Sequence, residues 1–175
     1  ATLYGQALLS QGKIEEGAGF LARRAASDTL DPDAASMLGR AMLLLGDSET
    51  AVRELKRAAR LDPGDRSVTG MLARLLITLE RPDEGVPLLE WVVEHHRALE
   101  PELISLAAGY SMLGEHESSH AALDGSVARF GETQAILRAR GATYFGEGDT
   151  DGALAAYERL IEQNPESVTA LNFVR

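Results

Sequence analysis

The amino-acid sequence repeats itself with a period of 34 residues. The clearest sign is one column of small residues, Gly5, Gly39, Ala73, Ala107 and Gly141. A fixed period of this length indicates an array of structural repeats, in which each unit packs against its neighbours in the chain. The period therefore restricts the fold more strongly than any single motif in the sequence does.

Four further columns keep the same period. Two hold large residues, Leu8, Met42, Leu76, Tyr110 and Tyr144 in one and Leu21, Leu55, Leu89, Leu123 and Tyr157 in the other. A third holds the small residues Gly17, Ala51, Gly85, Ser119 and Ala153, and a fourth holds Gly12, Gly46, Glu80, Gly114 and Gly148. Five columns that agree on one period are very unlikely to arise by chance.

Each unit is predicted to form two helices. Residues 33–45 carry apolar side chains at helical spacing, and Gly46 supplies a stop because glycine enters the left-handed conformation at little cost. Asp47 or Ser48 is expected to cap a second helix that runs to about Leu61. We expect the small residues to lie where the paired helices cross, with the large residues filling the space beside them.

This pattern resembles the tetratricopeptide repeat (TPR) family. Unit 32–65 matches the family pattern through Gly39, Met42, Gly46, Ala51, Leu55, Ala58 and Pro63. Unit 134–167 matches it through Gly141, Tyr144, Gly148, Ala153, Tyr157 and Pro165. The resemblance implies an all-α fold, a TPR-type α-solenoid in which helix-turn-helix repeats form a right-handed superhelix. It also implies a non-enzymatic scaffold for protein–protein interaction, without a cofactor.

The resemblance implies that residues 1–175 form a single TPR array. Its units are about 1–31, 32–65, 66–99, 100–133 and 134–167, and residues 168–175 would begin a sixth unit or a capping helix. The first helix begins abruptly and the last is cut short, whereas arrays normally end in a helix with a polar outer face. We therefore expect this segment to belong to a longer protein.

Composition excludes several classes of partner. The formal net charge of −10 argues against nucleic acid and against an anionic membrane surface. No apolar run approaches the roughly 18 residues of a membrane-spanning helix. Cysteine is absent, so disulfides and thiol chemistry are excluded. Arg outnumbers Lys 15 to 2, which favours a bacterial source, and a soluble segment of the cytoplasm or the periplasm fits equally well.

In TPR proteins the first helix of each pair lines the concave groove. In those helices (about 1–11, 34–45, 68–79, 102–113 and 136–146) Glu102 is the only acid, whereas the bases are Arg40, Arg74, Arg138 and Arg140. Nearly all of the 27 acidic residues therefore belong to second helices and loops. A negatively charged chain can thus present a groove that suits an acidic peptide.

The family geometry places a set of apolar and polar side chains in that groove. They are Gln6, Leu9, Arg40, Leu43, Leu44, Arg74, Ile77, Ile104, Ser111, Met112, Arg138 and Phe145. Apolar patches with separate arginines suit an extended or helical peptide that carries a carboxylate, because the guanidinium offers a planar fork of donors. The alternative is that Arg40 and Arg74 only keep the groove soluble or pair with neighbouring acids.

Three other functions remain as alternatives. The family resemblance allows a segment of a bacterial envelope, secretion or exopolysaccharide-export assembly. It also allows a scaffold that self-assembles into homo-oligomers through its terminal repeats. A zinc hydrolase would use His116, Glu117 and His120, which match the HExxH motif. The repeat pattern disfavours that site, because His116 falls at a turn and the sequence offers no third ligand.

Overall fold

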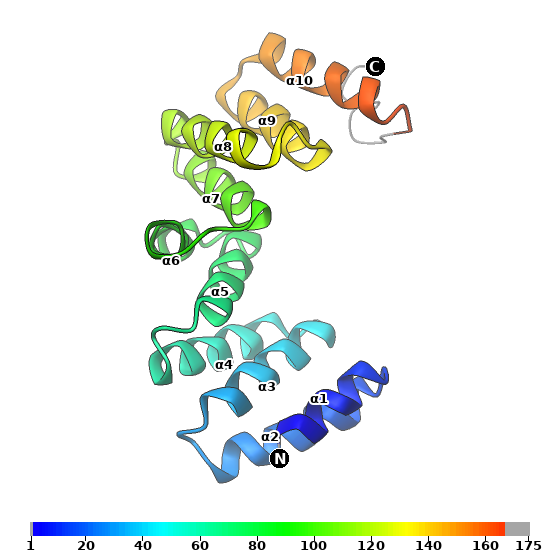
Figure 1. The fold of residues 1–175 in the computed structure, drawn as a ribbon, viewed down its shortest axis with the longest axis vertical. Helices are drawn as coiled ribbons and strands as arrows, with labels where there is room; N and C mark the ends of the chain where they lie inside the picture. Colours follow the sequence, from blue (N-terminus) through cyan, green and yellow to red (C-terminus); the bar gives the residue numbers. More distant parts are fainter. Residues whose placement is uncertain (1, 167–175) are drawn as a thin grey trace. The chain divides into compact units, whose positions relative to one another are not determined.

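The structure, a computed structural model, describes residues 2–166 as an all-helical chain (Figure 1). Its helices are α1 (Thr2–Ser10), α2 (Ile14–Ser27), α3 (Pro32–Leu44), α4 (Ser48–Leu61), α5 (Arg66–Thr78), α6 (Pro82–His95), α7 (Glu100–Met112), α8 (His116–Phe130), α9 (Gln134–Glu147) and α10 (Thr150–Gln163). The all-α prediction is confirmed. The expected start of a sixth unit, residues 168–175, lies outside the described residues.

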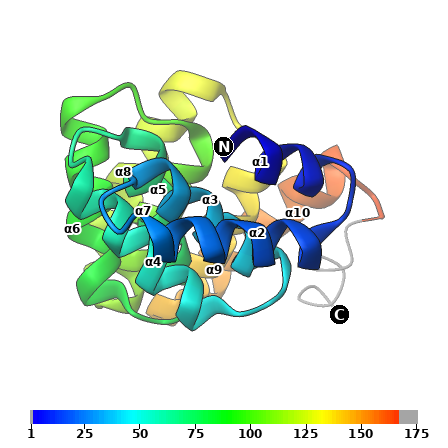
Figure 2. The same cartoon turned by 90° about the horizontal axis from the view of Figure 1, so that it is seen from below.

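The chain divides into two compact units, residues 1–76 (unit 1) and residues 77–175 (unit 2). Within unit 1, α2 packs against both α1 and α3, α3 packs against α4, and α1 also contacts α3. Figure 2 shows α1 and α2 side by side nearest the viewer. Within unit 2, consecutive helices from α6 to α10 pack against each other, and α7 also contacts α9. First helices of successive pairs are therefore neighbours in both units.

The paired helices pack tightly at the glycines of the first column of small residues. A Cβ atom added to Gly39 would lie 2.8 Å from Cγ of Leu55, and one added to Gly141 would lie 2.6 Å from Cζ of Tyr157. Leu55 is fully buried, so it cannot move aside into solvent. The second small column lies at the same crossing, because a Cβ added to Gly17 would approach the Leu9 side chain. The glycines of both columns therefore lie where the paired helices cross, with too little room for a side chain.

The turn between the two helices of a pair contains one residue in the left-handed conformation in each of the five repeats. Gly12, Gly46, Gly114 and Gly148 have φ angles of 77°, 79°, 76° and 81°. Glu80 occupies the same column with a φ of 56°, and it is the only non-glycine residue with a positive φ among residues 2–166. An L-residue is strained in this conformation because its Cβ crowds the backbone.

Aspartates fix the starts of several helices. The Asp47 carboxylate accepts a hydrogen bond from the Thr50 backbone N–H at 3.0 Å, which settles the choice between Asp47 and Ser48 as the cap of α4. Hydrogen bonds from Thr50 hold the pKa of Asp47 below its ordinary value. Asp149 caps α10 in the same way, through the backbone N–H of Gly152 at 2.9 Å. The acidic residues at these positions therefore serve the fold.

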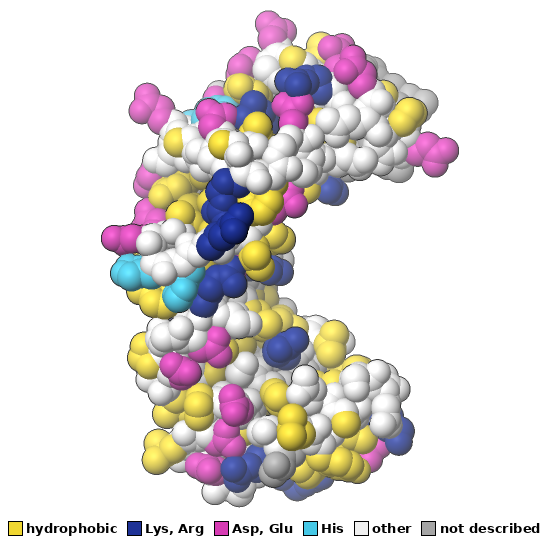
Figure 3. Space-filling model, in the orientation of Figure 1, with side chains coloured by type: hydrophobic (Ala, Val, Ile, Leu, Met, Phe, Trp, Pro, Cys, Tyr) yellow, Lys and Arg dark blue, Asp and Glu magenta, His cyan; other side chains and the backbone are white. Residues whose placement is uncertain are grey.

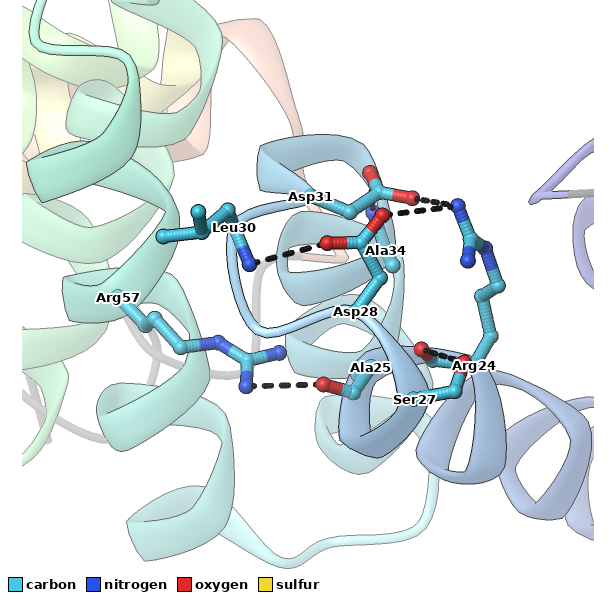
Figure 4. A network of polar contacts seen from close by, with 8 residues as sticks. All are labelled: Arg24, Ala25, Ser27, Asp28, Leu30, Asp31, Ala34 and Arg57. Carbon is cyan, nitrogen blue, oxygen red and sulfur yellow. Dashed lines mark hydrogen bonds and ion pairs between the residues drawn. The ribbon is translucent and has the colours of Figure 1, made fainter.

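A polar network joins α2, the following loop and α4 in unit 1 (Figure 4). The Arg24 guanidinium lies 2.9 Å from the Asp31 carboxylate and 3.3 Å from that of Asp28. Arg57 of α4 reaches across to α2, where its guanidinium donates to the Ala25 carbonyl oxygen at 3.3 Å. The long side chain of Arg57 thus spans the space between the two second helices of unit 1.

Within the described part of the chain, no helix is both long enough and apolar enough to cross a membrane. The helices instead carry both buried and exposed residues, and the buried side chains form a core of mainly leucine, alanine and valine.

Replacing Glu80 by glycine should stabilise the protein. Glycine adopts the left-handed conformation without the Cβ crowding, so Glu80→Gly is expected to raise the free energy of unfolding by about 1 kcal/mol. Urea unfolding followed by circular dichroism measures the change. The reverse substitution in another unit, Gly46→Glu, should lower stability by about 1–2 kcal/mol. A loss of stability in Glu80→Gly would contradict the assignment of strain to this turn.

Candidate partner-binding surface

Unit 1 contains a pocket between its two first helices, α1 and α3. Its volume is about 270 Å³, and its walls come from Gln6, Leu9, Ser10, Met37, Arg40 and Leu44. Four of these six residues belong to the set expected in the groove. Leu44 is 63% exposed, so a large apolar side chain stands at the pocket without being covered by the fold. The pocket combines an apolar floor with amide, hydroxyl and guanidinium groups.

Arg40 supplies the charge of this pocket. Its side chain is exposed, and among residues 2–166 it has no carboxylate partner. The alternative that Arg40 pairs with a neighbouring acid is therefore not what the structure shows. Arg74 of α5 is also exposed but has an interaction within the chain, so the two arginines differ in their surroundings.

Unit 2 presents an apolar patch at the C-terminal ends of α7 and α9. Met112 is 50% exposed and Phe145 is 63% exposed. The two helix ends are close together, because a Cβ added to Gly146 would lie 3.3 Å from Oγ of Ser111. Arg138, roughly two turns before Phe145 along α9, is exposed and has no carboxylate partner among the described residues. Unit 2 thus repeats the combination of apolar side chains and a separate arginine.

Ile77 does not belong to this surface. It is only 4% exposed, and its Cδ1 atom would lie 2.8 Å from a Cβ added to Gly109 of α7. The glycine leaves room into which the isoleucine packs, so Ile77 is a core residue against α7 and cannot contact a partner. Leu43 and Ile104 are half-buried and contribute only part of their side chains to the surface.

The charged residues of the first helices differ in whether they are engaged within the chain or exposed. Glu102 is buried, and its carboxylate accepts a hydrogen bond from the Leu99 backbone N–H at 2.6 Å at the start of α7. Arg140 pairs with Asp124 of α8. Figure 3 shows basic side chains gathered over α7 on the face in view, while acidic ones project near α6 and α10. The exposed arginines of the expected groove are therefore Arg40, Arg74 and Arg138.

The HExxH segment forms a contact between α8 and α9. His116 is the first residue of α8, and His120 follows one turn later. Nε2 of His120 lies 2.6 Å from Oε1 of Glu147, the last residue of α9, and Nδ1 of His116 lies 3.6 Å from the same oxygen. The Tyr144 ring lies beside His120, with centroids 4.6 Å apart. Oε1 of Glu147 has no hydrogen-bond partner among the described residues, so both histidines lie close to it without hydrogen-bond geometry.

No group of three or more His, Cys, Asp or Glu side chains among residues 2–166 is placed to hold a metal ion. The sequence offered no third group near the histidines, and the structure brings Glu147 to them from the following repeat. Its carboxylate lies against both histidines, so the cluster is a contact between successive helix pairs.

Two lining residues of the unit 1 pocket lay outside the twelve that sequence reasoning selected. Ser10 is adjacent to Leu9 and occupies the same repeat position as Leu44, so the period could have found it. Met37 lies one turn before Arg40 on α3, a position that the family geometry does not assign to the groove.

Comparison with known proteins adds to this geometry. Family models described as tetratricopeptide repeats match residues 32–75 and residues 137–167. The chain is a tetratricopeptide-repeat protein. A search of curated protein sequences finds no match. TPR proteins bind protein or peptide partners and are generally non-enzymatic scaffolds, and the fold of this chain is that of such a scaffold.

Solved structures share the TPR fold at low sequence identity. YrrB, described as a TPR protein with an unusual peptide-binding site, is 18% identical with a TM-score of 0.84, covering 97% of this chain and 87% of its own. MamA from Desulfovibrio magneticus RS-1 is 21% identical with a TM-score of 0.83, covering 94% and 93%. TTC0263, a thermophilic TPR protein of Thermus thermophilus, is 22% identical with a TM-score of 0.69, covering 97% and 93%.

The HExxH segment should bind no stoichiometric zinc. Protein incubated with zinc and then passed over a desalting column is expected to retain less than one ion per chain, because residues 2–166 contain no group of three ligating side chains placed to hold a metal ion. Elemental analysis of the eluted protein measures the ratio. One zinc ion per chain, lost in both His120→Ala and Glu147→Ala, would contradict this expectation.

Proposed function

We propose that this TPR protein is a scaffold that binds a peptide segment of a partner, with an apolar side chain and a neighbouring carboxylate held at the α1–α3 pocket. The observation that carries the proposal is the convergence of Gln6, Leu9, Arg40 and Leu44 on one pocket of unit 1. These residues come from two different repeats, so their meeting depends on the packing of α1 against α3.

The chemistry of the pocket favours an acidic, partly apolar peptide. Leu9, Met37 and Leu44 offer apolar surface whose burial by a partner is favourable. Arg40 offers a guanidinium without a carboxylate partner in the described chain, and such a group can receive a carboxylate through two parallel hydrogen bonds. Gln6 and Ser10 add polar groups that can pair with a peptide backbone.

Two further findings support a peptide ligand. In unit 2, Met112, Phe145 and Arg138 provide a second surface of the same composition, on first helices as in unit 1. YrrB, whose fold this chain shares, is described as having an unusual peptide-binding site. The proposed scaffold would thus hold an extended partner at successive repeats.

Charge reversal at the pocket should weaken peptide binding. Octapeptides selected by display on the wild-type protein are expected to carry an acidic residue next to a large apolar one. Their affinity should fall at least about tenfold in Arg40→Glu, which replaces an attraction of about 1.4 kcal/mol by repulsion. Leu44→Asp should cause a similar loss because it removes the exposed apolar wall. Fluorescence anisotropy of labelled peptides measures the dissociation constants.

The matched control is Arg23→Glu. Arg23 is an exposed arginine of α2 in the same unit, and it does not line the pocket. The substitution changes the net charge equally, so affinity should stay within about twofold if the effect is local. Equal losses in Arg23→Glu and Arg40→Glu would show a general charge effect and overturn the pocket assignment. Selected peptides without acidic residues would overturn it as well.

A further inference from the structure

A second cavity lies in unit 2, among α6, α7 and α8. Its volume is about 420 Å³, within the range of about 300–1,000 Å³ that small-molecule sites occupy. Val93 of α6 forms one wall, Leu103, Leu106 and Tyr110 of α7 form the floor, and α8 forms the other wall. The cavity belongs to a different unit from the α1–α3 pocket and shares no residue with it.

The wall from α8 is unusual because its side chains are short. Ala121, Ala122 and Gly125 line the cavity, and a Cβ added to Gly125 would meet nothing within 4 Å. The residues two repeats earlier in the chain are Arg53, Glu54 and Arg57. In unit 1, Arg57 reaches across the corresponding space toward α2, with Glu54 beside it.

The contacts of Arg57 in unit 1 show which interactions are missing at Gly125 in unit 2. Arg57 donates to the Ala25 carbonyl oxygen, which ties α4 to α2 (Figure 4). The same guanidinium pairs with Glu54 at 3.0 Å. One repeat after Gly125 stands Arg159, which pairs with Glu132. Gly125 is therefore the place where a long side chain is missing, and the cavity is the space it would occupy.

The two ends of the cavity carry opposite charge. Arg129, in the last turn of α8, is the only charged residue of the described chain that lines it, and its guanidinium donates to the Ala98 carbonyl oxygen. At the other end the Tyr110 hydroxyl donates to the Glu90 carboxylate at 2.7 Å. Burial and the nearby carboxylates of Glu90 and Glu115 raise the pKa of Tyr110. These two carboxylates place negative charge at this end of the cavity.

Arg129 is available to a ligand that carries negative charge. Among the described residues it has no carboxylate partner, and its guanidinium lies 5.1 Å from the centre of the Phe130 ring. Ser118 and Arg129 mark the two ends along α8, and eleven residues of helix correspond to about 16 Å. The cavity is thus an open, mostly apolar pocket with Arg129 at one end and the Glu90 carboxylate near the other.

We propose that this cavity binds a small amphiphilic carboxylate, with its hydrocarbon chain against Leu103 and Leu106 and its carboxylate at Arg129. The opposite orientation would place the carboxylate beside Glu90 and Glu115, where like charges repel. The apolar floor excludes ligands that are polar along their whole length, because their groups would lose hydration without gaining partners.

Isothermal titration of the full chain with sodium octanoate tests the site. The wild-type protein should bind one octanoate per chain. Gly125→Arg should abolish this binding, because the new side chain would extend into the cavity as Arg57 reaches across the corresponding space in unit 1. Gly125→Ala is the matched control, since it adds one methyl group in open space and should keep the affinity within about threefold. Circular dichroism checks that each variant is folded.

The carboxylate and its arginine are tested with a second ligand and a second variant. Arg129→Gln should weaken octanoate binding at least about tenfold and leave the affinity for octan-1-ol unchanged, because the alcohol does not need the guanidinium. If Gly125→Arg fails to fold, Ala121→Phe provides the same obstruction from the next turn. Arg40→Glu should not alter octanoate binding, so this site and the peptide pocket can fail separately.

Three results would overturn the proposal. They are absence of saturable octanoate binding by the wild-type protein, equal octanoate affinity in the wild-type protein and Gly125→Arg, and equal loss of octanoate and octan-1-ol binding in Arg129→Gln. Binding of an acetylated Leu-Phe dipeptide acid in place of octanoate would assign the cavity to a protein partner, and would also overturn it.

Discussion

The close approach of two helices at a glycine is the interaction on which the other features of this TPR protein depend. In unit 1, Leu55 fills the space that a side chain at Gly39 would need, and in unit 2 Tyr157 does the same at Gly141. Within each unit, a helix pair packs against the next through both of its helices, so the first helices of successive pairs also meet. The α1–α3 pocket and the patch at the ends of α7 and α9 both follow from that arrangement.

Repeat architecture also separates the charges of the molecule. Acidic residues such as Asp47 and Asp149 cap second helices, and Glu102 accepts a hydrogen bond from the backbone at the start of α7. Arginines of the first helices remain at the surface, with Arg40 lacking a carboxylate partner in the described chain. A chain with a net charge of −10 can therefore expose basic groups where a partner would bind. Net charge describes the solubility of such a protein better than it describes its ligand.

Periodicity predicted the helix pairs, the end of α4 at Leu61 and the left-handed turns, because these features depend on residues close together in the sequence. The surface was harder to predict. Leu9, Ile77 and Phe145 share one repeat position, yet they are half-buried, buried and exposed. Their burial depends on the facing helix, since Gly109 leaves room for Ile77. The α6–α8 cavity likewise depends on Gly125, whose importance appears only when its counterpart Arg57 is seen to reach across the equivalent space.

A double-mutant cycle at Gly39 and Leu55 tests the central claim most directly. The free energies of unfolding of the wild type, Gly39→Leu, Leu55→Ala and the double variant are measured in urea. If the two positions share one space, each single variant loses about 2–3 kcal/mol and the double variant recovers at least about 1 kcal/mol of the summed loss. Additive losses, with no recovery in the double variant, would show that the two residues do not compete for that space and would contradict the account.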